Sequence, residues 1–377
     1  MIWITVFLLS MISILAIYSS ASGLAFRMSG GNTESYVFKH AITIGIGLVV
    51  MYLIHRVDYR IFGRLSNVLF LLTIPLLLYT AIRGAEVNEA ARWIKVFGQS
   101  FQPSDLGKLT LMIYLAKLLT LRQDVIKDFY EGFLPALFWV SVICGLIAPS
   151  DLSTAALMFM ASLMVMFIAG VDLKYLGLLV MVAIVGMGIL GSTAKRSATW
   201  ESRWSDYTNR ILDAEYTPNA QTTQSHIAFA TAGLFGKGVG KSAQRNYIPH
   251  AHADFIFAVI VEEYGLVGGA VVLLLYLILL FRAVSIVTMS RTFGGLLAAG
   301  LAFILVLQAL MNMGVTVGLL PVTGLPLPLL SMGGTSILIT CISLGIILSV
   351  SRHAMEGSLD PSGNTHKKSL RARWANA

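Results

Sequence analysis

The chain alternates long apolar runs with short polar connections. A helix needs about 20 mostly apolar residues to cross the hydrocarbon core of a bilayer. Ten such runs occur, at about 2–21, 40–55, 65–82, 104–120, 133–148, 153–170, 174–191, 257–282, 296–318 and 333–351. The pattern therefore predicts an all-α integral membrane protein with ten transmembrane helices.

The polar segments define the rest of the predicted organisation. Residues 1–351 form one polytopic membrane domain, in which about 192–255 is a long loop between the seventh and eighth spans. Residues 352–377 form a polar tail. An even number of spans places both termini on the same side of the membrane.

Composition supports the membrane assignment and indicates an orientation. The 377 residues are 56% hydrophobic and 12% charged, whereas a soluble domain carries about 25% charged residues. With cytoplasmic termini, 14 of the 27 Lys and Arg residues fall in inner loops and the tail, against 6 near short outer connections. Because basic residues concentrate in cytoplasmic loops, the net charge of +8 predicts cytoplasmic termini and an outer long loop, not a nucleic-acid partner.

The clearest candidate for chemistry is Asp254, at the start of the eighth span. A carboxylate at bilayer depth costs roughly 2.5–3.5 kcal/mol or more unless it faces water or a partner. His250 and His252 precede it and Glu262 follows eight residues later, which is not a metal-ligand pattern of fixed spacing. We therefore expect Asp254 to be functional and assign no metal to these histidines.

Two Pro-Ser-Asp segments open the fourth and sixth spans. Asp105 and Lys108 are three residues apart, so they share one helical face and can pair. They form either a self-satisfied ion pair or a site where Lys108 offers a cation to a water-filled cavity. Asp151 either caps its helix or lines the same cavity.

Two further segments have a simpler interpretation beside a functional one. Leu234–Ser242 is similar to a phosphate-binding loop, but Phe235 stands at the first glycine position and no buried strand precedes it. We therefore predict a flexible turn there, or contacts of Lys237 and Lys241 with lipid phosphates, and no nucleotide site. Residues 90–97, with Arg92 and Trp93, suggest an interfacial anchoring helix.

The stretch 312–336 interrupts an apolar region with glycine and proline. Non-helical backbone near a membrane must be buried in protein or line a cavity. This stretch therefore marks a surface that does not face lipid.

Together these blocks resemble the SEDS family of membrane glycosyltransferases, which polymerise peptidoglycan. The resemblance covers nearly all ten spans. Within the family, the segment 238–245 is more similar to the division branch (FtsW) than to the elongation branch (RodA). The residues that carry the resemblance are Gln102–Lys108, Pro149–Leu152, Gln221–Ser225, Asp254–Ala258 with Glu262–Gly265, and Asn312–Ser336.

The resemblance implies an inverting transferase that acts on lipid II at the outer face of the cytoplasmic (inner) membrane. A sugar 4-hydroxyl would attack the anomeric carbon, form a β-1,4 bond and expel the lipid pyrophosphate. Asp254 would be the general base. The residues implied in substrate binding are Asp105, Lys108, Asp151, Arg92, Arg210, Gln224, Ser225, Lys237 and Glu262.

Positive charge is needed beside the departing pyrophosphate. The resemblance assigns this role to Lys108 and Arg210, with Lys237 or a divalent cation (Mg²⁺ or Mn²⁺) in addition. It also implies a class B penicillin-binding protein and other divisome or elongasome proteins as partners.

Four residues depart from the family pattern, in which Glu, Thr, Tyr and (in many members) Arg stand where this chain has His250, Ala253, Met332 and Ser100. They alter the polar surroundings of the proposed base. Two other functions remain open on the residues alone: a flippase that moves lipid II across the bilayer, and a scaffold that only recruits a partner. A flippase would use the same cavity and charges, because it must also pass a pyrophosphate head group.

Overall fold

A computed structural model describes residues 1–28, 33–83, 85–87, 90–96, 99–193, 197–213, 216–248, 251–289 and 293–358. The described chain is almost entirely helical, with one small antiparallel sheet of order β1-β2-β3. The helices are α1 (Ile2–Met28), α2 (Thr33–Arg56), α3 (Arg60–Arg83), α4 (Pro103–Leu121), α5 (Leu134–Ile147), α6 (Leu152–Ala169), α7 (Leu173–Thr193), α8 (Ser197–Leu212), α9 (Ala220–Ala232), α10 (Ile256–Met289), α11 (Phe293–Val317) and α12 (Gly334–Ser358). The strands are β1 (Ala85–Val87), β2 (Ala90–Val96) and β3 (Gln99–Phe101).

Each of the ten predicted spans falls on one of these helices, namely α1 to α7 and α10 to α12. Within the described residues, eight helices are long and apolar enough to cross a membrane. Helix α4 carries Asp105, Lys108 and Lys117, and α7 has a shorter apolar stretch, Leu173–Gly186. The protein is therefore a multi-pass membrane protein, and the count of ten crossings stays a prediction.

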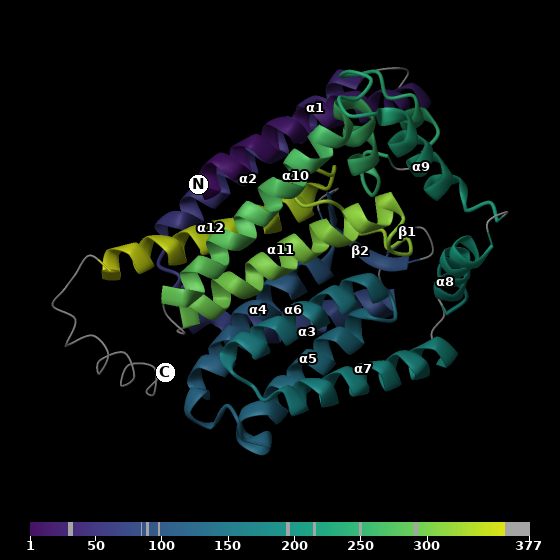
Figure 1. Ribbon diagram of the computed structural model, residues 1–377. Helices are drawn as coiled ribbons and strands as arrows, with labels where there is room; N and C mark the ends of the chain where they lie inside the picture. The colour runs from purple at the N-terminus through teal and green to yellow at the C-terminus, as the bar shows by residue number, and fades with distance from the viewer. Residues whose placement is uncertain are drawn as a thin grey trace.

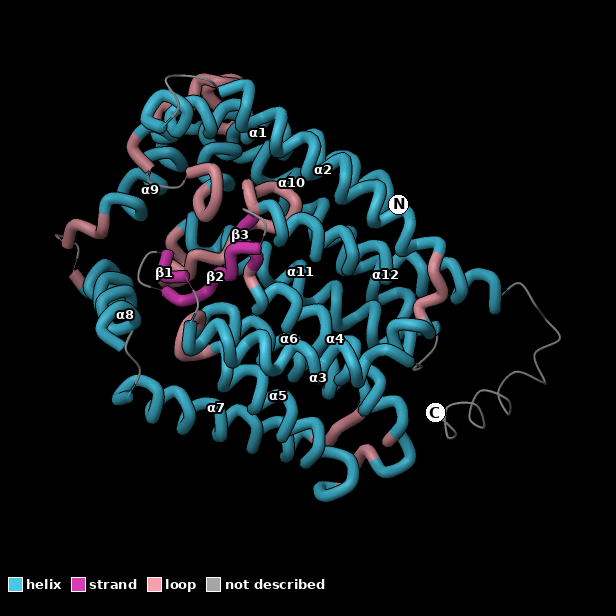
Figure 2. The backbone as a smooth tube through the Cα atoms, turned by 180° about the vertical axis from the view of Figure 1, so that it is seen from behind, coloured by secondary structure: helices cyan, strands magenta, loops and turns pink. Residues whose placement is uncertain are grey.

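The helices are arranged as a tilted bundle with two distinct ends (Figure 1). The start of α1 and the last turns of α12 lie at one end, and the sheet, α8 and α9 lie at the other, as Figure 2 also shows. This arrangement agrees with an even number of crossings. Which end faces the cytoplasm stays a prediction.

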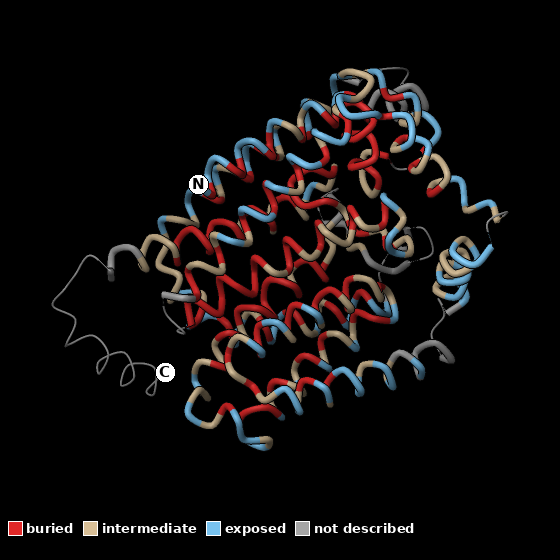
Figure 3. Tube along the Cα trace, in the orientation of Figure 1, coloured by how far each residue is buried: buried red, intermediate tan, exposed pale blue. Residues whose placement is uncertain are grey.

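Helix α11 is the centre of the bundle (Figure 3). Of its apolar stretch 83% is buried, against 22% for α2, whose outward face is apolar. Small residues allow neighbours to approach closely: a Cβ added at Gly300 would come within 3.0 Å of Met112 on α4 and Val165 on α6. Polar side chains on α11 are thus held at fixed positions by helices on several sides.

Helix α10 is broken at Gly265, whose φ of 73° is left-handed. The loop after α9 fills the break: the amides of Lys237 and Gly238 donate to the carbonyls of Glu262 and Glu263 (2.9 and 3.0 Å). The two backbones touch, since a Cβ on Gly236 would lie 2.2 Å from Glu263 O. Close backbone approach, not phosphate binding, therefore explains the glycine-rich sequence here.

The expectation of an interfacial helix at residues 90–97 was wrong. Residues Ala90–Val96 form β2, which pairs with β1 on one side and β3 on the other. The segment is too short for a stable helix, and its β-branched residues Ile94 and Val96 favour a strand. Pairing on both sides satisfies the backbone groups that a single exposed strand would leave open.

Candidate active site

Asp254 lies in a turn, residues 251–255, that leads into α10. Three consecutive carbonyls of this turn accept hydrogen bonds from the 312–332 stretch. The amide of Met332 donates to His252 O (2.9 Å), the hydroxyl of Ser331 donates to Ala253 O, and Asn312 Nδ2 donates to Asp254 O (2.7 Å). These three bonds fix the backbone around Asp254, and Asp254 is half-buried.

Gln308, Asn312 and Thr316, four residues apart on α11, form what we call the polar stripe. All three are buried. Asn312 also donates to Leu325 O (2.8 Å), and Gln308 donates to Pro326 O (2.7 Å). The polar stripe thus holds the irregular backbone that precedes α12 against the Asp254 turn. Residues 323–331 of the 312–336 stretch are buried or half-buried, as expected for backbone that does not face lipid, whereas Val317, Leu319 and Leu320 are exposed.

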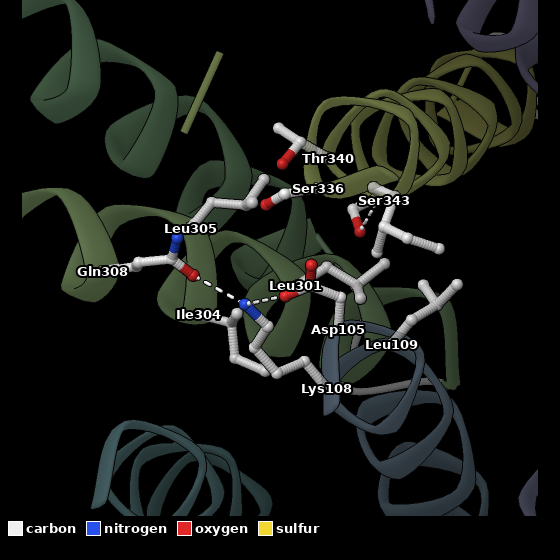
Figure 4. Close-up of a pocket in the computed structure, with 11 residues that line it drawn as sticks. Asp105, Lys108, Leu109, Leu301, Ile304, Leu305, Gln308, Ser336, Thr340 and Ser343 are labelled. Atoms are coloured by element: carbon white, nitrogen blue, oxygen red, sulfur yellow. Dashed lines mark hydrogen bonds and ion pairs between the residues drawn. The ribbon is translucent and has the colours of Figure 1, made fainter. Parts of the chain in front are cut away.

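The other side of the polar stripe meets the start of α4 (Figure 4). Lys108 Nζ lies 2.7 Å from Asp105 Oδ1 and donates to Gln308 Oε1 at 2.8 Å. Both charged side chains are buried, with 9% and 5% of their surfaces exposed. The predicted Asp105–Lys108 pair is therefore confirmed, and Gln308 joins it to the polar stripe.

The Asp105–Lys108 pair borders a small pocket. Leucine and isoleucine side chains line part of it, and Ser336, Thr340 and Ser343 of α12 bring hydroxyl groups to it. Asp105 Oδ2 is buried and has no hydrogen-bond partner among the described residues; in Figure 4 this carboxylate lies between Lys108 and α12. The pair is thus not self-satisfied, because one oxygen is left to accept from a ligand or water.

Asp151 caps α6, since its Oδ1 accepts from the amide of Thr154 at 3.1 Å. It also lines a second small pocket with Ser104 and Thr80. Gln102 Nε2 reaches Ser104 Oγ (2.9 Å) and Asp151 Oδ2 (3.5 Å). No described residue lines both cavities, although Ser104 and Asp105 are adjacent in sequence.

Arg210 lies on α8, beyond the membrane-spanning helices. Its guanidinium donates to Gly318 O and to His226 Nε2 (3.1 Å), and stands 5.2 Å from the centre of the Tyr207 ring. Burial, followed by the charge of Arg210, lowers the pKa of His226. The structure therefore uses Arg210 to hold backbone at the end of α11.

Two more residues of α8 share this role. Tyr207 donates its hydroxyl to Leu319 O (2.9 Å), and Arg203 donates to Val322 O (3.1 Å). Together with Arg210 they donate hydrogen bonds to three backbone carbonyls within residues 318–322. The next glycine, Gly324, stands beside Asp254, because a Cβ there would be 3.6 Å from Asp254 Oδ2. Helix α8 thus secures the segment that borders the carboxylate.

Lys237 and Glu262 pair with each other at 2.6 Å. Glu262 is fully buried and also accepts from the hydroxyl of Ser242 and from the amides of Ala243 and Gln244 (3.2 Å each). Every bond named here joins the loop after α9 to α10. The Lys237–Glu262 pair therefore has a structural role, because it fastens this loop to α10.

The remaining predicted residues lie as follows. Ser225 is buried on α9 and donates to Thr316 O at 2.7 Å, which brings it to the polar stripe. Gln224, on the same helix, is half-buried. The side chains of Arg92 and Ser100, and residue His250, lie outside the described residues. Met332 packs against the core.

The described residues contain no group of three or more His, Cys, Asp or Glu side chains that could hold a metal ion. Asp105 Oδ2 is buried without a partner among the described residues, but the other oxygen of this carboxylate binds Lys108. A neighbouring ammonium group repels a cation, so the described residues do not fit a divalent metal there.

Sequence reasoning missed Gln308, the residue that joins Lys108 to the irregular backbone before α12. The available signal was an amide in the interior of an apolar run, because polar residues inside a span face protein or water. Ser331 was noticed only as part of the 312–336 stretch. Its role depends on which carbonyl lies opposite, and the pattern carries no such information.

Comparisons with known proteins agree with this geometry. The sequence profile of a family described as "Cell cycle protein" (FtsW, RodA and SpoVE) matches residues 1–356. A probable peptidoglycan glycosyltransferase FtsW from Geobacter sp. (strain M18) is 34% identical over 355 residues, which cover 91% of this chain and 94% of that protein. Stage V sporulation protein E from Bacillus subtilis (strain 168) is 34% identical over 332 residues, which cover 85% of this chain and 88% of that protein.

Solved structures show the same fold. The rod shape determining protein RodA of Thermus thermophilus superposes with a TM-score of 0.67 at 26% identity, covering 93% of this chain and 97% of that one. A chain from a study titled "Structural coordination of polymerization and crosslinking by a peptidoglycan synthase complex" gives a TM-score of 0.70 at 28% identity, with 93% and 98% covered. The chain therefore belongs to the FtsW/RodA/SpoVE family.

Proposed function

We propose that this protein is a peptidoglycan glycosyltransferase that polymerises lipid II into β-1,4 glycan strands. The observation that carries the proposal is the double attachment of the polar stripe. On one side Gln308 accepts from Lys108, and on the other Asn312 holds the backbone of Asp254. One rigid helix thus organises both a buried cation and a carboxylate, the two groups that the reaction needs. The names of the relatives support the same chemistry.

Asp254 acts as the general base in this proposal. Its carboxylate takes the proton of the attacking sugar 4-hydroxyl while that oxygen bonds to the anomeric carbon. The bond from that carbon to the lipid pyrophosphate breaks, and its electron pair leaves with the phosphate oxygen. Attack from the opposite face inverts the anomeric centre.

Lys108 stabilises the charge that develops on the pyrophosphate. A cation held in a water-poor site is effective for this purpose because it needs no reorganisation during the reaction. Asp105 Oδ1 and Gln308 Oε1 orient the ammonium group. Asp105 Oδ2, which has no partner among the described residues, accepts from a substrate hydroxyl or from water.

The setting of the reaction follows from the same proposal. Lipid II is presented at the outer face of the cytoplasmic membrane, with both termini of the chain in the cytoplasm and residues 192–255 outside. Residues 1–351 form the membrane domain and 352–377 the cytoplasmic tail. The partner is a class B penicillin-binding protein, within a divisome or elongasome. Support comes from the solved relative, which is part of a peptidoglycan synthase complex.

A flippase would use the same buried charges, but it needs no general base and its relatives would be named as transporters. The relatives here are named glycosyltransferases. Lipid II flipping is therefore the less favoured function.

The test is polymerisation of lipid II by the purified protein in liposomes, with its partner present. Asp254→Asn keeps the size and most hydrogen bonds but removes the base, so we expect glycan synthesis to fall about 100- to 10,000-fold. The half-buried Asp172, before α7, provides the control: Asp172→Asn should remain active. An active Asp254→Asn protein would overturn the assignment of the base. A wild-type protein that moves fluorescent lipid II but makes no glycan would establish the flippase.

A further inference from the structure

The turn formed by residues 327–332, just before α12, contains a strained residue. Leu329 has a φ of 64°, and among the residues that the structure describes it is the one non-glycine with a left-handed backbone. Leucine avoids this region because Cβ approaches the following carbonyl oxygen. The side chain of Leu329 is also buried. Such a conformation persists only where the surroundings enforce it, and strained residues of this kind gather at functional sites.

Two side chains hold the carbonyls on either side of Leu329. The hydroxyl of Tyr276, from α10, donates to Pro328 O, and the hydroxyl of Ser13, from α1, donates to Leu330 O at 3.1 Å. Behind Ser13 stands His40 of α2, whose Nε2 is 2.8 Å from Ser13 Oγ. All three side chains are buried.

The direction of the Ser13–His40 bond follows from proton counting. A serine hydroxyl has one proton, and Ser13 gives it to Leu330 O. Ser13 Oγ therefore accepts from His40, so Nε2 of the imidazole carries a hydrogen. The chain of donors runs in one direction, from His40 to Ser13 to Leu330 O.

The same turn reaches the Asp254 turn directly. Ser331 accepts the amide of Leu327 (2.7 Å) and donates to Ala253 O, while the amide of Met332 donates to His252 O (2.9 Å). These contacts lie one and two residues before Asp254. A shift at Leu330 is therefore transmitted to the backbone of Asp254 through Ser331 and Met332.

A histidine inside an apolar span is costly unless it has a function. Helices α1 and α2 contribute none of the residues that line the described cavities, so His40 cannot act on a substrate bound there. We propose that Ser13 and His40 are positioning residues for the proposed glycosyl transfer, which hold the strained Leu329 turn and thereby place the Asp254 carboxylate. The proposal rests on Asp254 being the base.

The first experiment compares two serines on α1. Ser13→Ala removes the bond to Leu330 O. Ser10→Ala is the matched control, because Ser10 is equally buried on the same helix and its hydroxyl has no described partner. We expect Ser13→Ala to lower kcat for glycan synthesis about 10- to 100-fold, the effect of misplacing a reacting group by a fraction of an ångström to one ångström. KM for lipid II should not change, and Ser10→Ala should match wild type in both constants.

The second experiment tests His40 by conservative rescue. The amide nitrogen of glutamine can stand where Nε2 stands, so His40→Gln should keep most of the activity. His40→Leu cannot donate and should behave like Ser13→Ala. Equal activity of the two variants would show that His40 only fills space, and would overturn its part of the proposal.

Hydrogen exchange gives a readout independent of activity. The amide of Ser331 donates to Leu327 O within the turn, and the amide of Met332 donates to His252 O. Ser13→Ala and His40→Leu should therefore speed the exchange of both amides, while helices remote from the turn exchange as in wild type. Unchanged kcat and unchanged exchange in both variants would overturn the positioning role. If Asp254→Asn stays fully active, the assignment of Asp254 as the general base is wrong, and the positioning proposal that rests on it is wrong as well. If Asp254→Asn is inactive while Ser13→Ala equals wild type, only the positioning role of Ser13 is wrong.

Discussion

Two ion pairs with buried carboxylates, both expected from the sequence to bind substrate, are built in opposite ways. Lys108 and Asp105 belong to one turn of α4, border a small pocket, and leave Asp105 Oδ2 without a partner among the described residues. Lys237 and Glu262 come from segments 25 residues apart. Glu262 accepts four donors that all come from the loop after α9.

The difference lies in what each pair leaves open. A buried carboxylate whose acceptor positions are filled by the protein contributes to stability, because each donor would otherwise lose its partner. A buried carboxylate with an unused oxygen beside a cavity can accept from a ligand. The types of residue do not separate the two cases, whereas the number of hydrogen bonds to the carboxylate does.

The largest expected effect is at the Asp105–Lys108 pair, whose carboxylate has an unused oxygen. Asp105→Asn combined with Lys108→Met removes the pair without leaving an unpaired buried charge, which by itself would be strongly destabilising. We expect glycan synthesis from lipid II to fall at least about 100-fold, as for loss of one group that stabilises developing charge. The apparent melting temperature in detergent should change little. A double variant that polymerises normally would remove Lys108 from the mechanism.

The matching change at the Lys237–Glu262 pair is Glu262→Gln combined with Lys237→Met. It leaves the backbone amides of Ala243 and Gln244 with a poorer acceptor, so we expect a loss of about 1–3 kcal/mol in stability. The melting temperature should fall while activity per folded molecule is kept. If instead stability is normal and activity is lost, Lys237 and Glu262 bind substrate after all, and the comparison between the two pairs fails.

The smallest effect concerns Arg210, which, like the Lys237–Glu262 pair, holds a neighbouring segment of the protein in place. Burial and Arg210 lower the pKa of His226, so the neutral ring accepts from Arg210 in the fold. As the pH falls below the ordinary value of about 6.5, the unfolded chain binds a proton that the fold resists. Stability from this contact is therefore present at neutral pH and declines on acidification.

His226→Gln keeps an acceptor but does not titrate, and it is the control for this pH dependence. Hydrogen exchange of α8 in wild type should increase as the pH is lowered through this range, after correction for intrinsic rates. In the variant it should not. An identical pH dependence in both proteins would show that Arg210 and His226 are not coupled.

Much of the fold could be predicted from the sequence because the bilayer imposes a length and a polarity on each span. The ten apolar runs fall on helices, and residues 327–331 of the glycine- and proline-rich stretch 312–336 are buried. The strand Ala90–Val96 could not be predicted in this way. It is too short for hydrophobic periodicity to separate helix from strand, and its partners on either side decide its conformation.

The sequence by itself determined that a carboxylate at position 254 stands at the edge of a span, and that Asp105 and Lys108 share a helical face. Both follow from local spacing. Only the tertiary structure decided that Gln308 and Asn312 join these groups through α11. It also decided that Glu262 accepts its hydrogen bonds from the loop after α9, and that Ser13 and His40 support the Leu329 turn. The physical reason is that a hydrogen bond depends on which atoms meet in space, and residues 13, 40 and 330 meet only after three separate segments have packed together.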